Sequence, residues 1–258
     1  MRGAQRENTG AQIFSLKTPH PPHLLFFFRK DPAVRAAIAT VRAAAAGGPG
    51  RPPPAAVLGA VLALERAKLS PAPFFPAITG GTSTGRRWRL TYTAGTAAVV
   101  AAMKAGGVAA GGFGGGGAYV PVTAVQRWSA AGGGGGGGPT PAPASSTSPA
   151  PARQAGAIEN GVFLGWLGAL VFGGTFDLAG RRLPFALDSL RVRVGPKWFE
   201  FPFSTTRKGG GGDKGGGGPF FLLAYVDDGV VVARGKSGGM AVWARAGDAW
   251  CARAGVDA

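Results

Sequence analysis

The chain has 258 residues, including 47 glycines and 21 prolines, and its formal charge of +16 favours anionic partners. A single cysteine, Cys251, excludes an internal disulfide and a cysteine-based metal cage. The apolar run at 24–28, LLFFF, is far shorter than the ~20 residues of a bilayer-spanning helix, so we expect no integral membrane segment.

The N-terminal segment, residues 1–50, is rich in arginine and alanine, with Glu7 and Asp31 as its only acids. Asp31 and Pro32 form a suitable N-cap and first helical position, and they open a basic amphipathic helix. Such an acid-poor helix near the start of a chain is typical of an organelle transit peptide. We therefore expect residues 1–50 to be a transit peptide without fixed structure, with an ordinary disordered basic tail as the alternative.

The next segment, residues 55–69, has apolar residues at helical spacing and ends before Pro71. We expect it to form a helix that caps one end of the core. From Trp88 onward the apolar period becomes two, and Leu90 and Tyr92 follow on the same predicted face as Trp88. Three glycine-rich insertions, which cannot support core packing, are expected to be disordered: 105–118, 129–156 and 207–218.

The second half of the chain alternates apolar and charged residues, as half-buried strands do. Between residues 187 and 190 the apolar phase shifts by one position, which predicts a bulge. Residues 220–245 predict three short strands joined by turns at 227–229 and 235–239. About eight such strands predict a mainly β protein with an antiparallel barrel at 51–245, followed by a tail at 246–258.

Motifs for catalysis have the wrong context in this chain. Ser83 lies in a GTSTG pattern, but a strand instead of a helix is expected to follow, and His20 and His23 are the only histidines. The adjacent Asp227 and Asp228 fit a tight turn better than a metal or acid–base pair. We therefore predict no catalytic residue, no metal, no cofactor and no enzymatic activity.

Six segments resemble, in order, the strands of the plastid lipid-associated protein (fibrillin) family. They are GRRWRLTYT (85–93), AVQRW (124–128), GAIENGVFL (156–164), LPFALDSLRVRV (183–194), FEFPF (199–203) and the stretch 220–245. The resemblance covers roughly residues 55–245. It implies a lipocalin-like barrel with a hydrophobic pocket, which the helix predicted at 55–69 would cap.

The resemblance also implies roles for individual side chains. Trp88 on the first strand would stack with Arg245 of the last strand and seal one end of the barrel by a cation–π contact. Aromatic residues would line an apolar cavity, with a dry packed core as the alternative. The candidate lining residues are Trp88, Tyr92, Phe163, Phe176, Phe185, Phe199, Phe201, Phe221 and Tyr225.

The functional hypothesis is a non-enzymatic, plastid lipid-associated protein. The resemblance implies binding of prenyl lipids, carotenoids or fatty acids, or coating of a plastoglobule or thylakoid surface. Four basic residues are candidates for contact with anionic headgroups: Arg181, Arg182, Arg191 and Arg193. The alternative is a basic, glycine-rich nucleic-acid-binding protein, which the net charge favours.

Overall fold

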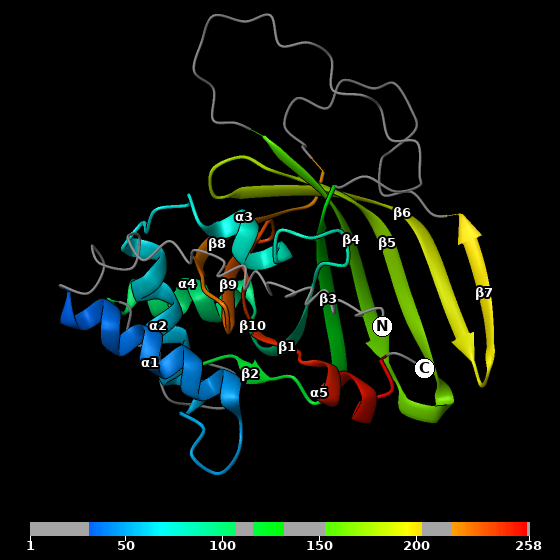
Figure 1. Ribbon diagram of the computed structural model, residues 1–258. Coiled ribbons are helices and arrows are strands. Elements are labelled where there is room, and N and C mark those ends of the chain that lie inside the picture. Colours follow the sequence, from blue (N-terminus) through cyan, green and yellow to red (C-terminus); the bar gives the residue numbers. More distant parts are fainter. Residues whose placement is uncertain (1–30, 107–115, 132–152, 203–217, 257–258) are drawn as a thin grey trace, which may run out of the picture.

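The computed structural model describes residues 31–106, 116–131, 153–202 and 218–256. These residues form a closed antiparallel barrel with helices around it (Figure 1). The strands are β1 (Arg86–Ala94), β2 (Ala118–Tyr119), β3 (Thr123–Ala130), β4 (Gln154–Phe163), β5 (Gly168–Leu178), β6 (Arg182–Val194), β7 (Lys197–Pro202), β8 (Phe220–Val226), β9 (Val230–Gly235) and β10 (Met240–Arg245). The helices are α1 (Pro32–Ala46), α2 (Pro54–Arg66), α3 (Phe74–Thr79), α4 (Thr96–Lys104) and α5 (Asp248–Arg253), with a short 3-10 helix η2 (Gly165–Leu167).

The barrel runs in the order β1, β3, β4, β5, β6, β8, β9, β10, and β10 pairs with β1 to close it. Strand β6 changes partners along its length: residues 182–184 pair with β8, and residues 189–194 pair with β7. The register with β5 shifts between Leu187 and Ser189, which confirms the predicted bulge. As a result the far halves of β5 and β6 leave the barrel wall and, with β7, form a projecting sheet (Figure 1).

The barrel interior is filled by buried side chains from every one of the eight wall strands. Trp88, Trp128 and Trp243 meet near the centre, and Phe74 and Ile78 of α3 close one end. The remaining buried members are Ile158, Phe176, Leu178, Leu183, Leu223, Val226, Val231 and Ala233. Burying this much apolar surface at ~25 cal/mol per Å² is the main stabilisation of the barrel.

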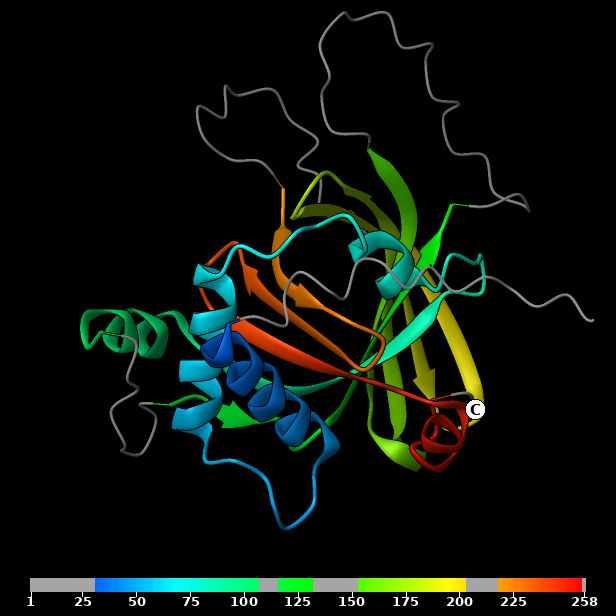
Figure 2. The same ribbon diagram turned by 60° about the vertical axis from the view of Figure 1, so that its left-hand side comes forward.

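A second core lies outside the barrel, where α1, α2 and α4 cover the outer face of β8, β9 and β10 (Figure 2). The helix α2 confirms the helix predicted near residues 55–69, and its Val57, Leu58 and Val61 are fully buried; it covers the outer face of the barrel, and α3 closes the end that α2 was expected to cap. The strand side of this core includes Val230, Val232 and Val242. These three strands are therefore apolar on both faces.

Helix α1 begins at the predicted N-cap, where the Ala33 amide donates to Asp31 Oδ1 at 2.8 Å. Its Val41 and Ala44 are fully buried in the second core. The expectation that all of residues 1–50 lack fixed structure is therefore wrong for 31–50. The apolar stripe that gives the helix its amphipathic character packs against the domain.

The segment after β10 is also part of the domain and not a tail. Trp250 of helix α5, and Val256 just after the helix, pack against Val125, Phe163 and Val171 on the outer face of β3, β4 and β5. The cores of the three glycine-rich insertions fall outside the described residues, at 107–115, 132–152 and 203–217. The expectation of disorder there, and in residues 1–30, remains a prediction. At the edges of the second insertion it is wrong, because residues 129–130 belong to β3 and residues 154–156 belong to β4.

Candidate functional site

Four of the nine candidate lining residues lie in the barrel interior. Trp88 and Phe176 are buried, and Phe185 and Phe221 pack against them. The rings contact one another: Phe185 stacks on Phe221 at 5.1 Å between ring centroids, and Phe221 meets Trp243 edge-on at 5.4 Å. These aromatic residues therefore pack with each other in the interior of the barrel.

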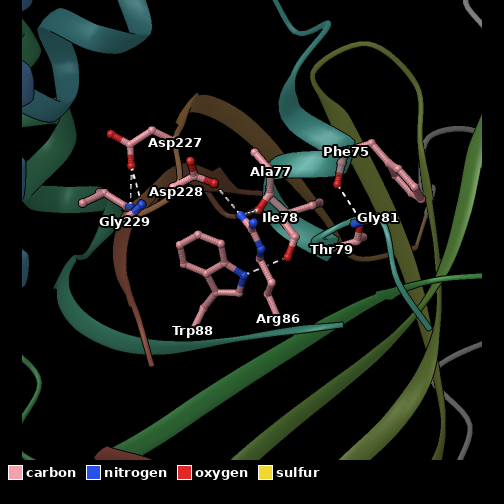
Figure 3. Close-up of polar contacts among 11 residues, drawn as sticks. Phe75, Ala77, Ile78, Thr79, Gly81, Arg86, Trp88, Asp227, Asp228 and Gly229 are labelled. Carbon is pink, nitrogen blue, oxygen red and sulfur yellow. Dashed lines mark hydrogen bonds and ion pairs between the residues drawn. The ribbon is translucent and has the colours of Figure 1, made fainter. Parts of the chain in front are cut away.

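The closed end of the barrel is held by Arg86 and Trp88 (Figure 3). Trp88 Nε1 donates to the Ile78 carbonyl of α3 at 2.9 Å. Arg86 Nη1 donates to the Ala77 carbonyl at 2.8 Å and to Asp228 Oδ1 at 2.7 Å, so it joins α3 to the β8–β9 turn. Arg245 is the register partner of Trp88 but its side chain is exposed. Within the described residues no cation–π contact joins the two, so the expected Trp88–Arg245 stack is replaced by these bonds to α3.

Tyr92 and Tyr225 lie outside the barrel wall, in contrast to the expected lining role. The register shifts at Thr91 in β1 and at Ala224 in β8, and each shift turns the following tyrosine to the outer face. There Tyr92 donates to the Pro54 carbonyl at 3.1 Å, and Tyr225 donates to Asp227 Oδ2 at 2.7 Å. Burial raises the pKa of both phenols, so both remain donors at neutral pH.

Phe163 is also on the outer face, because it lies five residues from the interior Ile158 and side chains alternate along a strand. It packs under α5 instead of into the barrel. Of the nine candidates, three are therefore on the outside of the wall. The two that remain, Phe199 and Phe201, lie on β7.

Phe199 and Phe201 belong to an exposed apolar surface, which we call the inner face. It continues the interior side of the barrel onto the projecting sheet, since Phe201 pairs with Leu190 and Leu190 with Phe172. Phe199 is 47% exposed and Phe201 is 48% exposed. The inner face consists of Leu170, Phe172, Leu190, Val192, Phe199 and Phe201.

The inner face ends in polar groups next to the packed interior. Phe172 pairs with Asn160 of β4, and Asn160 pairs with Gln126 of β3, whose amide nitrogen donates to Asn160 Oδ1. The Gln126 Oε1 and Trp128 Nε1 atoms are buried and have no hydrogen-bond partner among the described residues. One row of paired residues therefore crosses the sheet from the half-exposed Phe201 to Gln126, whose buried side-chain oxygen has no partner among the described residues. The row is Phe201, Leu190, Phe172, Asn160 and Gln126.

The end of the projecting sheet is a cluster of exposed apolar residues, which we call the tip. It contains Leu164, Trp166 and Leu167 of the β4–β5 connection and Val194 at the end of β6, and Trp166 is 86% exposed. Arg193 is buried and donates to the Gly165 carbonyl at 3.0 Å, which fixes the connection against β6. The backbone of Gly168 packs so closely against β6 that a Cβ at this position would lie 2.2 Å from the Arg193 carbonyl oxygen.

A cleft of about 460 Å³, here the outer cleft, lies on the opposite side of the same sheet. Its apolar lining is Val125, Gly161, Phe163, Val171 and Val256, and Trp198 forms one edge. The charged lining is Arg87, Arg127, Arg191 and Glu159. Glu159 accepts from Arg127 at 3.2 Å and from Arg191 at 2.8 Å, and Arg87 lies 4.0 Å from the exposed carboxylate of Asp248. The lining itself holds three arginines and one carboxylate, so the cleft is cationic.

The four arginines proposed for headgroup contact do not form one surface. Arg191 and Arg193 flank Trp198, each with its guanidinium carbon 5.7 Å from the ring centroid. Arg181 and Arg182 lie at the opposite end of β6, roughly 30 Å away at about 3.3 Å per residue. There Arg181 donates to the Leu223 carbonyl at 2.9 Å and Arg182 lies over the Phe220 ring.

A second cleft, of about 490 Å³, lies between α1 and the β8–β9 turn. Arg42 of α1 contacts Asp227 at 2.6 Å, and Asp227 also accepts from the amides of Gly229 and Val230. Burial opposes the ionisation of Asp227, but the hydrogen bonds from Tyr225, Arg42 and the two amides outweigh it and lower its pKa. This arrangement holds α1 on the barrel and explains Asp227 as a turn residue.

The described part of the chain holds no candidate metal site. It contains no group of three histidine, cysteine or acidic residues that could hold a metal ion. Ser83 lies in an exposed turn before β1, and His20 and His23 fall outside the described ranges. None of the helices described is long and apolar enough to cross a membrane.

Comparisons of the chain with protein-family models, with curated proteins and with solved structures find no match. The lipocalin-like barrel is confirmed by the strand order alone. The resemblance to the plastid family remains a prediction.

The tip and the outer cleft are the parts of the site that sequence reasoning missed. A signal for the tip was available: Leu164, Trp166 and Leu167 are apolar residues in a hairpin connection with Gly165 and Gly168, where polar residues are usual. The cleft had no such signal. Its arginines come from β1, β3 and β6, and only the strand pairing brings them together.

Proposed function

We propose that the protein is a non-enzymatic lipid-associated protein that binds a hydrophobic molecule on the inner face of its projecting sheet. The observation that carries this proposal is the half-exposed pair Phe199 and Phe201, on a surface continuous with the packed interior. Covering one half-exposed phenylalanine removes about 100 Å² from water, which stabilises a complex by about 2 kcal/mol per ring.

The polar end of the inner face supports a ligand with one polar group. Gln126 Oε1, at the end of the row that leads from Phe172 through Asn160, would offer one acceptor to a ligand hydroxyl, and such isolated polar groups fix ligand orientation in apolar sites. The sequence resemblance supports prenyl lipids, carotenoids or fatty acids as the ligand class. It also supports a plastid lipid globule or thylakoid as the location.

Binding of an apolar fluorescent probe to the full-length protein tests the proposal. Phe201→Asp should abolish probe binding without unfolding the protein, because the exposed position on β7 lets the new charge reach water. Trp198→Asp is the matched control, since Trp198 has similar exposure on the opposite face of the same strand. Equal probe binding by wild type and Phe201→Asp would contradict the inner face as the site.

The nucleic-acid alternative rests on a separate observation, the three arginines and Trp198 of the outer cleft. Arginine and aromatic side chains together favour single-stranded nucleic acid. If the wild-type protein binds RNA with a steep dependence on salt and does not bind apolar probes, the alternative replaces the lipid proposal.

A further inference from the structure

We infer that the tip and the outer cleft together dock the protein on an anionic phospholipid surface. The tip would enter the boundary of the acyl chains, and the arginines of the cleft would contact the lipid phosphates. This inference rests on the proposed lipid association and names the surface and the residues through which it occurs.

The tip has the properties of a membrane-interface anchor. Trp166 is 86% exposed, and Leu164, Leu167 and Val194 at the same end of the sheet are also exposed apolar side chains. Tryptophan has an apolar body with one polar N–H and is enriched where membrane meets water. The buried Arg193 holds the connection in place, so the apolar surface is preformed.

The spacing along β6 matches the thickness of a headgroup layer. Arg191 is three residues from Val194, which is roughly 10 Å at about 3.3 Å per residue. Interfacial protein segments enter the headgroup and acyl boundary by about 5–10 Å. When the tip reaches the acyl boundary, Arg191 is therefore at the depth of the phosphates, with Trp198 between it and the tip.

The charge of the cleft favours phosphate over a neutral headgroup. Arg127 and Arg191 share Glu159, and Arg87, which lies 4.0 Å from the exposed Asp248, is the third arginine of the lining. Arginine presents a planar fork of donors that suits phosphate oxygens. Each basic residue near an anionic membrane contributes about 1 kcal/mol of attraction. Lys197, directly after the β6–β7 turn, adds a further cation next to the tip.

Co-sedimentation of the full-length protein with lipid vesicles tests the inference. Wild-type protein should bind vesicles of phosphatidylcholine weakly and bind vesicles with added phosphatidylglycerol more tightly. The double variant Trp166→Ala, Leu167→Ala should lose at least roughly tenfold in affinity for both vesicles, because its anchoring area is gone. Val100→Ala, Met103→Ala is the matched control on α4, where two exposed apolar residues lie away from the tip.

The cleft is tested by Arg127→Gln, Arg191→Gln, which should reduce the preference for anionic vesicles by roughly fivefold for each arginine. Unchanged preference would overturn the role of the cleft. If wild-type protein binds vesicles and the tip variant binds equally well, the inference is overturned while the proposed function stands. If wild type binds neither vesicles nor the apolar probe, the proposed function fails. A tip variant that changes only the oligomeric state of the soluble protein would identify the tip as a contact between copies, and would also overturn the inference.

Discussion

Trp88→Ala tests how the closed end of the barrel is stabilised. The indole is fully buried, contacts Trp128 at 6.3 Å between ring centroids, and donates to the Ile78 carbonyl. Removing a buried large aromatic side chain costs ~3–5 kcal/mol. Leaving the Ile78 carbonyl without its donor adds ~1 kcal/mol or more. We therefore expect the free energy of unfolding to fall by about 4–6 kcal/mol, a large share of the ~5–15 kcal/mol typical of a domain.

Two further variants separate the contribution of the buried Trp88 ring to stability from that of its hydrogen bond and from that of Arg245. Trp88→Phe keeps most of the buried ring and should cost only about 1–3 kcal/mol, mainly for the unpaired carbonyl. Arg245→Ala should change stability by no more than about 0.5 kcal/mol, because the side chain is exposed and does not contact the indole. Residues that do not interact give additive effects, so the double variant Trp88→Ala, Arg245→Ala should equal the sum of the single variants.

Urea unfolding followed by far-ultraviolet circular dichroism measures these differences, and comparison of the slopes checks that all variants unfold from the same compact state. Two results would refute the reasoning. One is a loss below about 2 kcal/mol for Trp88→Ala, which would mean that the ring is not buried as described. The other is a coupling energy above about 1 kcal/mol between Trp88 and Arg245, which would restore the stacking contact.

Three other predictions concern the turn, the tip and the closed end. The pKa of Asp227 is lowered in the folded protein, so the ionised carboxylate stabilises the fold above about pH 4, and this contribution is lost as the pH falls through the folded pKa. In Asp227→Asn the free energy of unfolding should therefore fall less steeply as the pH is lowered. Gly168→Ala should lower the melting temperature, because its Cβ would meet the Arg193 carbonyl, whereas Gly50→Ala has open space and should not. Arg86→Gln should destabilise the protein more than Arg87→Gln in urea unfolding, since only Arg86 joins α3 to the β8–β9 turn.

The sequence predicted the barrel and one of its bulges, but it misplaced two tyrosines for a definite physical reason. Alternation identifies the inner face of a strand only when the outer face is polar. On β8, β9, β10 and the last residues of β1, which include Tyr92 and Ala94, the outer face is covered by the second core. Both faces are therefore apolar there, and the shifts at Thr91 and Ala224 leave no visible break in the pattern. The bulge at residue 188 was predictable because charged residues mark the outer positions there.

Helix α1 was located correctly and assigned wrongly. Its boundaries follow from the Asp31 and Pro32 pair, which acts locally and can be read from a few residues. Its packing depends on a surface that β8, β9 and β10 form some two hundred residues later, together with the contact between Arg42 and Asp227. A basic amphipathic helix for import and one that packs on a barrel share the same local pattern.

The change of partner by β6 makes its seam with β8 the shortest among the described strands of the barrel, with three register pairs against four between β1 and β3. Residues 182–184 are the only register pairs between β6 and β8, and one further backbone bond flanks them on each side, from the Leu223 amide to the Arg181 carbonyl and from the Phe185 amide to the Pro219 carbonyl. Pro184 has no N–H to contribute. The seam should therefore open before any other, and the Leu183 and Leu223 amides should exchange with deuterium earlier than those of β9. Such an opening would connect the inner face to the aromatic interior while α1 and α5 keep their contacts with β10 and with the outer face of β3, β4 and β5.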